Sequence, residues 1–287
     1  MDRRAMVALS LAAALASPAR AAGAERRLKE IHKRIGGRLG VHVLDSQSGR
    51  RIAYDDGSRY AMASTFKLPL AAALLWQVDH GAFRLTHPLA IRNEDLKPNS
   101  PVVEAKLKAG ATQMNITELC SAVIVHSDNA AANVLLAGIG GPPAFTQFMR
   151  SLGDTTTRLD RTETELNSNV PGDPRDTTTP RAMVDALLRI FTQDVLSLTS
   201  RAMLIDWLAA SGTGLDRVRA GVPRSWPSGD KTGTGANGAV NDLCLLYPPG
   251  RRPIFVAVYM SESTLDVKTL SAAHAEIGAL IAREKWR

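Results

Sequence analysis

The sequence predicts an α/β fold, with an antiparallel sheet domain built from both chain termini and an all-α domain inserted between them. Residues 39–45 alternate and are rich in Val and Leu, as in a β-strand, and strand patterns return after residue 230. From about 64 to 210, apolar residues recur mainly with helical spacing. The strands of both ends must meet in one sheet, which leaves the helical middle as a second domain. We expect the active site in the cleft between these two domains.

The expected elements follow in order along the chain. Residues 46–49 form a turn, so 39–45 and 51–54 pair as a hairpin. Helices are expected at 68–76, 116–124, 129–137, 144–152 and 182–191. The C-terminal part is expected to hold strands at 230–234, 242–247 and 254–260, and a last helix at 270–285.

The first 21 residues are typical of an export signal. Arg3 and Arg4 precede an apolar stretch at 5–16, and Ala19-Arg20-Ala21 is a small-x-small cleavage site. The apolar stretch is too short to remain as a membrane anchor. We therefore expect cleavage near Ala21 and a periplasmic or secreted protein. The paired arginines leave the choice between twin-arginine and general export open.

Composition argues against several partner classes. The formal net charge is +7, but the basic residues are scattered and form no stripe with aromatic residues, so no nucleic acid is expected. The six histidines form no close pair with metal-ligand spacing, so neither a metal nor another cofactor is expected. Cys120 and Cys244 lie in apolar segments and are expected to be buried free thiols. We expect a monomer with no membrane partner after signal cleavage.

Three motifs occur in order along the chain: Ser64-Thr65-Phe66-Lys67, Ser127-Asp128-Asn129 and Lys231-Thr232-Gly233. A second Ser-x-x-Lys, at 228–231, contains Gly229 and follows Pro227, so it does not suit a helix. The first motif leads into a helical stretch whose N-terminus favours developing negative charge. The spacing of three places Ser64 and Lys67 on one face, which makes Ser64 the expected nucleophile.

The segment 161–176 shows no sustained period and is rich in Thr, Asn, Pro and Gly. Loops of this length inside a compact domain are usually functional. Arg161 and Asp176 stand at its ends, and we expect them to pair and close it as an Ω-loop. The all-α domain, 62–210, then carries both the Ser64 helix and this loop, while 22–61 and 211–287 form the sheet domain and 1–21 the signal peptide.

Together the motifs resemble those of the class A serine β-lactamases, from about residue 25 to the C-terminus. The resemblance implies that Ser127 passes a proton to the leaving nitrogen and that Asn129 donates to the substrate's side-chain amide. It also implies an oxyanion hole made by the backbone N–H groups of Ser64 and Thr234. Asp128 is expected to hold the turn, since Ser-Asp-Asn alone is also typical of a helix start.

A substrate carboxylate has an expected binding site on the strand opposite Ser64. The ammonium of Lys231 and the hydroxyls of Thr232 and Thr234 suit an anion. Some family members place a carboxylate-binding Arg where this chain has Val240, and Arg217 matches the alternative position from which others supply it. If that stretch is extended, Arg219 points to the other face. Gly233 would let another backbone approach closely.

Glu163 and Asn167 distinguish the possible functions. An acyl-enzyme needs a positioned water and a base to be hydrolysed, and a carboxylate with an amide can bind that water between them. The Glu-x-x-x-Asn spacing of the family selects Glu163 rather than Glu165 as this base. Lys67 and Glu163, the latter acting through water, both remain candidates for the base of acylation.

Besides Val240, the chain departs from the family pattern at three positions. Thr164 stands where many members have Pro, and the peptide before it is typically cis even so. Asn99 replaces an aromatic residue at the entrance to the cleft. Ala71 stands where the partner of Cys120 would lie in those members that carry a disulfide.

We therefore expect hydrolysis of the β-lactam amide through a Ser64 acyl-enzyme, deacylated by water that Glu163 activates. A D,D-peptidase and a penicillin sensor that stays acylated are the alternatives with the same fold. Neither requires the Glu163 and Asn167 pair, and both usually carry a membrane anchor. The sequence does not separate penicillins, cephalosporins and carbapenems as substrates.

Overall fold

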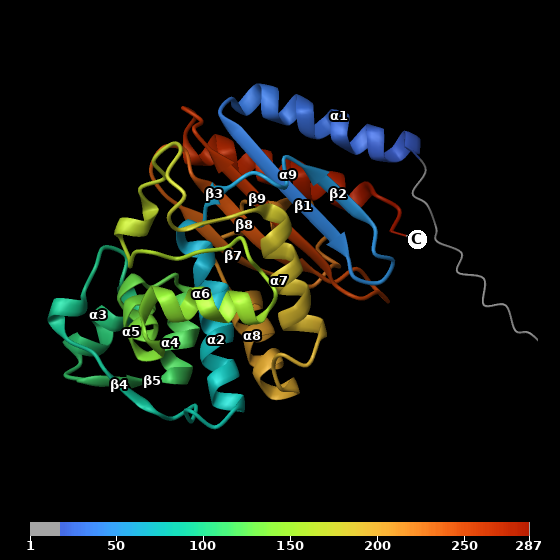
Figure 1. Ribbon diagram of the computed structural model, residues 1–287. Coiled ribbons are helices and arrows are strands. Elements are labelled where there is room, and N and C mark those ends of the chain that lie inside the picture. Colours follow the sequence, from blue (N-terminus) through green and yellow to red (C-terminus); the bar gives the residue numbers. More distant parts are fainter. Residues whose placement is uncertain (1–17, 287) are drawn as a thin grey trace, which may run out of the picture.

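The computed structural model describes residues 18–286 (Figure 1). The charged and apolar parts of the predicted export signal, within residues 1–17, lie outside this range. The first element described is helix α1, Pro18–Ile35, which runs through the predicted cleavage site after Ala21. No helix between residues 18 and 286 is long and apolar enough to cross a membrane.

Both ends of the chain meet in one five-stranded antiparallel sheet with the order β2-β1-β9-β8-β7. Its strands are β1 Arg38–Asp45, β2 Arg51–Tyr54, β7 Ser228–Thr234, β8 Val240–Leu246 and β9 Ile254–Ser261. The pairing of β1 with β9, where Val41 faces Val258, joins the N-terminal hairpin to the C-terminal strands. The predicted α/β fold is confirmed, and each expected strand is present within two residues at either end.

Helices fill the middle of the chain and one follows the sheet. They are α2 Lys67–Asp79, α3 Pro101–Lys108, α4 Ile116–Val125, α5 Asn129–Ile139, α6 Gly141–Ser151, α7 Pro180–Thr192, α8 Leu198–Ala210 and α9 Val267–Arg283. Two short strand pairs link distant segments: β3 Tyr60–Ala61 with β6 Thr177–Thr178, and β4 Pro88–Ala90 with β5 Gln113–Asn115.

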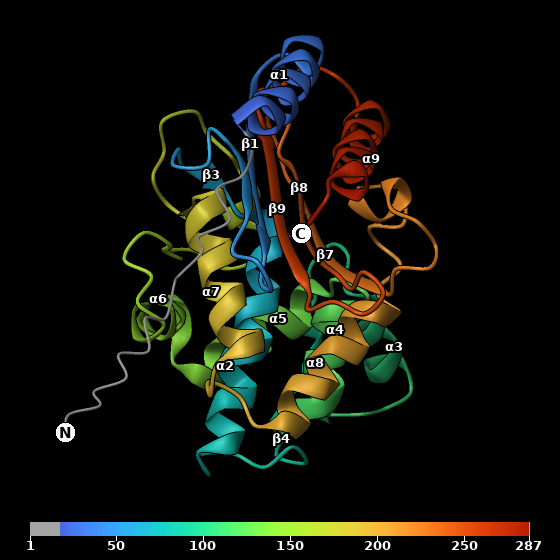
Figure 2. The same cartoon turned by 90° about the vertical axis from the view of Figure 1, so that its right-hand side faces the viewer.

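The sheet lies between two layers of helices, with α1 and α9 on one side and α2, α7 and α8 on the other (Figure 2). Because its side chains alternate between its faces, it separates two hydrophobic cores. Along β9, Phe255, Ala257 and Tyr259 join an inner core with α2, α4, α5, α7 and α8. Val256 and Val258 instead join an outer core beneath α1 and α9. Helix α2 is buried almost all round, which fits its nearly continuous apolar sequence. Burial fixes the position of this central helix, and the turn that precedes its N-terminus lies beside the end of β7.

Candidate active site

Ser64 lies in a 3₁₀ turn, Ala63–Phe66, immediately before α2. The expected α-helical turn from Ser64 to Lys67 is thus corrected to a 3₁₀ turn, in which residues three apart eclipse each other. Lys67 Nζ accordingly lies 3.0 Å from Ser64 Oγ and donates to it. A Cβ at Gly233 would lie 2.8 Å from the Met62 carbonyl oxygen and 3.2 Å from the Ser64 nitrogen. Glycine therefore lets β7 pass close to this turn, as predicted.

Lys67 is completely buried at the centre of the polar cluster. Its Nζ donates to the Ser127 carbonyl at 2.8 Å and to Asn129 Oδ1 at 2.5 Å, and it lies 2.9 Å from Glu163 Oε1. Burial lowers the pKa of Lys67, and the Glu163 carboxylate opposes that shift. A buried amine with a lowered pKa beside a hydroxyl is suited to exchange a proton with it.

The Ser-Asp-Asn turn brings Ser127 between the two lysines. Ser127 has a left-handed backbone, with φ of 55°, and its Oγ accepts from Lys231 Nζ at 3.0 Å and Lys67 Nζ at 3.4 Å. Asp128 is fully buried, caps α5 through the Ala131 N–H, and accepts the N–H groups that begin α3. Its side chain therefore holds the turn, as expected. Asn99 adds a hydrogen bond of 3.1 Å to the Ser127 carbonyl.

Lys231 is buried on β7, while Thr234 at the end of that strand is exposed. Burial, with the nearby charge of Lys67, lowers the pKa of Lys231 to about 7. Thr232 Oγ1 donates to Thr213 Oγ1 at 2.8 Å. Thr213 was not predicted, because no motif marks the loop that holds it.

Arg217 donates hydrogen bonds to the C-terminal end of β7. Its Nη1 donates to the carbonyls of Gly233 and Asn241 at 3.0 and 2.6 Å, and its Nη2 donates to Thr234 Oγ1 at 2.7 Å. The expectation that Arg219 points away along an extended stretch is wrong, because a 3₁₀ turn, Val218–Gly221, follows Arg217. Arg219 donates to the Ser211 carbonyl instead.

Glu163 connects the Ω-loop to Ser64. Its Oε1 accepts from Ser64 Oγ at 3.2 Å and its Oε2 accepts from Asn167 Nδ2 at 2.5 Å. Asn133 on α5 binds both backbone groups of Glu163, at 2.8 Å each. Sequence reasoning missed Asn133, although its place one helical turn after Asn129 puts both on one face. The peptide between Glu163 and Thr164 is cis.

The two ends of the Ω-loop lie next to each other. Arg161 Nε lies 2.5 Å from Asp176 Oδ2, and Asp176 is fully buried. The second oxygen of Asp176 accepts the backbone N–H groups of Asp160 and Arg161 at 2.7 and 2.9 Å. Within the loop, Asn167 Oδ1 is buried and has no hydrogen-bond partner among the described residues. An acceptor of this kind beside the Glu163 carboxylate marks a place for a water.

The remaining expectations concern thiols and metals. Cys120 and Cys244 are free and buried, and burial raises the pKa of both thiols. Over residues 18–286 no group of three or more His, Cys, Asp or Glu side chains is arranged to hold a metal ion.

Comparisons with known proteins agree with this geometry. The model of the beta-lactamase enzyme family matches residues 23–284. The carbapenem-hydrolyzing beta-lactamase KPC of Klebsiella oxytoca is 42% identical, over 88% of this chain and 85% of that protein. Beta-lactamase AST-1 of Nocardia asteroides is 43% identical, over 88% and 81%. The structure of an ancestral class A beta-lactamase superposes with a TM-score of 0.87 and 52% identity, over 90% of this chain and 98% of that one. The chain therefore belongs to the beta-lactamase enzyme family, as a class A serine β-lactamase.

Proposed function

We propose that the protein hydrolyses the amide of β-lactam antibiotics through an acyl-enzyme on Ser64. The observation that carries this proposal is the position of Glu163. Its carboxylate lies within 3.2 Å of Ser64 Oγ, Lys67 Nζ and Asn167 Nδ2 at once. The relatives named above are beta-lactamases, one of them carbapenem-hydrolyzing, which supports the same reaction class here.

Acylation begins with attack of Ser64 Oγ on the lactam carbonyl carbon. Two groups are placed to take its proton: Lys67 Nζ at 3.0 Å and Glu163 Oε1 at 3.2 Å, the latter directly or through water. The N–H groups of Ser64 and Thr234 would stabilise the oxyanion. Ser127 Oγ would then deliver a proton to the leaving nitrogen as the C–N bond breaks, supported by the two lysines beside it.

Deacylation requires a water at the ester carbonyl. Glu163 Oε2 and the unpaired Asn167 Oδ1 provide acceptors for its two protons, and Glu163 takes one of them as the water attacks. The ester bond to Ser64 breaks and the proton returns to Ser64 Oγ. Asn133 fixes the Glu163 backbone and so its reach towards this water.

Substrate recognition is assigned to the rim of β7 and to α5. Lys231, Thr232, Thr234 and Arg217 would bind the substrate carboxylate, with Thr234 already bonded to the Arg217 guanidinium. Asn129 Oδ1 accepts from Lys67, while its Nδ2 donates to the Pro98 carbonyl at 2.7 Å. The second hydrogen of this amide is assigned to the substrate's side-chain amide.

Neither alternative accounts for the whole site. A D,D-peptidase or an acylated penicillin sensor would not use the Glu163 and Asn167 pair.

We further propose action after export, in the periplasm or outside the cell, by a monomer without nucleic-acid or membrane partners. The proposed domains remain 22–61 with 211–287 for the sheet and 62–210 for the helices.

The test is multiple turnover followed by trapping. The wild-type protein should hydrolyse a chromogenic cephalosporin over many equivalents. Glu163→Ala should be acylated by a penicillin and remain so, because the base proposed for deacylation is removed and Glu165, the next carboxylate along the chain, is exposed. Mass spectrometry should find one drug mass on the peptide that contains Ser64.

Glu165→Ala is the matched control, because Glu165 is exposed two residues away. It should turn over like the wild type and accumulate no adduct. Full turnover by Glu163→Ala would assign the base to another residue. An absence of any adduct would instead make Glu163 necessary for acylation too.

A further inference from the structure

Two asparagines join the Ω-loop to the turn between β7 and β8. Asn169 Nδ2 donates to the carbonyls of Ala236 and Asn237 at 3.1 and 2.9 Å, and Asn237 Nδ2 donates to the carbonyls of Ser168 and Asn169, both at 3.1 Å. Ser261 Oγ, at the end of β9, lies 2.9 Å from Asn169 Nδ2 and 3.1 Å from its Oδ1. We call Asn169, Asn237 and Ser261 the asparagine clasp.

The backbone at the clasp explains why asparagine is suited to it. Asn169 and Asn237 have φ of 43° and 48°, in the left-handed region that glycine occupies most easily and asparagine tolerates. Glycine would therefore satisfy the turns alone. Asparagine adds amide donors, and in Asn169, which is 9% exposed, these donors are nearly all withdrawn from water.

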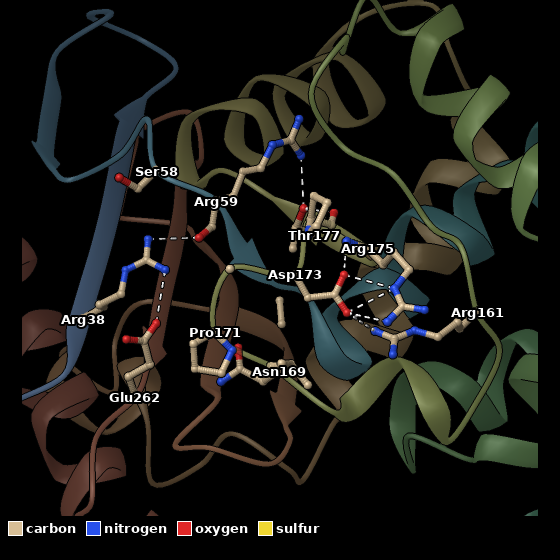
Figure 3. A pocket seen from close by; sticks show the side chains of 14 residues that line it. Arg38, Ser58, Arg59, Arg161, Asn169, Pro171, Asp173, Arg175, Thr177 and Glu262 are labelled. Atoms are coloured by element: carbon tan, nitrogen blue, oxygen red, sulfur yellow. Dashed lines mark hydrogen bonds and ion pairs between the residues drawn. The ribbon is translucent and has the colours of Figure 1, made fainter.

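The clasp is important because part of the loop beside it faces a cavity. A cavity of 220 Å³ separates the loop arm 169–175 from Arg38, Arg59 and Glu262 (Figure 3). Asp173 in this arm pairs with Arg175 at 2.8 Å and with Arg161 at 3.7 Å, so these ion pairs join the loop to itself. The clasp instead ties the arm to the sheet and its β7–β8 turn.

The clasp is also adjacent to the group that would hold the deacylating water. Asn167, two residues before Asn169, accepts the Ala236 N–H on its carbonyl at 2.8 Å and donates its side-chain amide to Glu163. A Cβ at Gly235 would lie only 2.7 Å from that carbonyl oxygen, so loop and turn are in close contact here. A shift of the turn is therefore transmitted directly to Asn167.

We propose that Asn169 and Asn237 are positioning residues for deacylation, which hold the Asn167 amide where it shares a water with Glu163. This inference rests on the proposed hydrolysis of an acylated Ser64. Acylation depends less on the clasp, because Lys67 lies on α2, Lys231 lies on β7 and Ser127 lies in the turn before α5. The clasp therefore acts selectively on the second half of the reaction.

The test uses Asn169→Gly and Asn237→Gly, which keep the left-handed backbone and remove the amide donors. Deacylation of a penicillin should slow about 10-fold, since a misplacement of about 1 Å can cost about 100-fold. Slower deacylation lowers kcat and KM together and leaves kcat/KM within about twofold. Stopped-flow should then show a product burst, and mass spectrometry an acyl-enzyme in the steady state.

Three further variants separate positioning from stability. Asn115→Ala removes the cap of α4, which accepts the Glu118 N–H at 2.9 Å far from the loop, and should lower Tm without changing kcat. Ser261→Ala, the mildest change to the clasp, should slow deacylation by about threefold. The double glycine variant should be no slower than the slower single variant, because both residues form one clasp.

Two results in the glycine variants would overturn the proposal. One is an equal fall in kcat/KM and kcat, and the other is a lower Tm with unchanged kcat. A wild-type protein that does not turn over at all would overturn the proposed function itself. Normal turnover by wild type and Asn115→Ala, with no acyl-enzyme in either glycine variant, would reject the clasp alone.

Discussion

Two fully buried lysines flank Ser127, and their environment makes them chemically different from surface lysines. Burial lowers the pKa of both, and the charge of Lys67 adds to the shift of Lys231, whereas Glu163 opposes the shift of Lys67. Both ammonium groups therefore give up a proton to a neighbouring group more readily than a surface lysine does. The same two residues in water would remain charged and serve only as cations.

Arg217→Ala tests the substrate carboxylate site. A charge-assisted contact is about twice as strong as a neutral hydrogen bond. We therefore expect the variant to lose about 2–3 kcal/mol of transition-state stabilisation, which lowers kcat/KM for carboxylate-bearing substrates about 30- to 150-fold. Val240, which is buried, has no group to replace the guanidinium. The measurement is steady-state kinetics with a penicillin.

Arg224→Ala is the matched control, because it removes the same charge from an exposed position nearby. It should leave kcat/KM unchanged. An unchanged kcat/KM in Arg217→Ala would mean that its bonds to Gly233, Thr234 and Asn241 only brace the strand.

At the scale of residues, short motifs were the predictable part of the site. Ser64, Lys67, Ser127 and Lys231 were selected by spacing and order, and the structure brings them together. Asn133 and Thr213 were missed because each acts through a contact between distant segments, with Glu163 and Thr232 respectively. No local pattern records such a contact.

At the scale of elements, the Ω-loop is held by its ends rather than by a regular backbone. Apart from the short 3₁₀ turn Glu165–Asn167, its described backbone forms no helix or strand before β6. At the base of the loop, the Asp176 carboxylate accepts hydrogen bonds from one guanidinium and two backbone N–H groups. A fully buried carboxylate with these partners supports the whole segment that carries Glu163.

Asp176→Asn should loosen the loop and impair deacylation more than acylation. Removing one partner of a buried pair costs about 3–5 kcal/mol, compared with at most about 1 for an exposed pair. Arg161 is 19% exposed, so water offsets part of this cost. Calorimetry should record a lower Tm and rapid-quench kinetics a slower deacylation.

Asp160→Asn is the comparison for the loss of a carboxylate just before the loop, because Asp160 pairs with the more exposed Arg158 and accepts only one backbone N–H from Asp176, at 3.0 Å. It should lower Tm by less. If Asp176→Asn changed neither Tm nor turnover, closure of the loop by this ion pair would be wrong.

Elements with strong periodicity were predictable, whereas others depend on the rest of the fold. The five sheet strands and the helices α2, α4, α5, α6, α7 and α9 follow the apolar pattern. Helix α3 was missed because only Val103 of its eight residues is buried, so its apolar signal is weak. The two-residue strands β3 and β6 exist because tertiary packing brings Tyr60 to Thr178.

At the scale of the molecule, the inner core joins the two halves of the chain. Leu243, Leu245 and Phe255 of the sheet belong to the same cluster as the buried side chains of α2, α4 and α5. The inner face of the sheet therefore shares one apolar interior with the helical segment, whereas the outer core is formed by the sheet half alone. Cooperative units follow buried surface rather than sequence boundaries.

We therefore expect the sheet and the helices to unfold together. Trp76 packs against the inner core and Trp286 lies buried in the outer core, so each reports on one side of the sheet. In two variants that retain either Trp76 or Trp286 as the single one of the four tryptophans, urea unfolding followed by fluorescence should give the same midpoint. Leu243→Ala removes a buried side chain from the sheet and should lower the free energy of unfolding by about 2–5 kcal/mol. Both tryptophans should then report the same lower urea midpoint. Val170→Ala, on the exposed Ω-loop, should move neither. Separate midpoints, or a Leu243→Ala effect at Trp286 alone, would show instead that segment 62–210 folds as an independent unit with a core of its own.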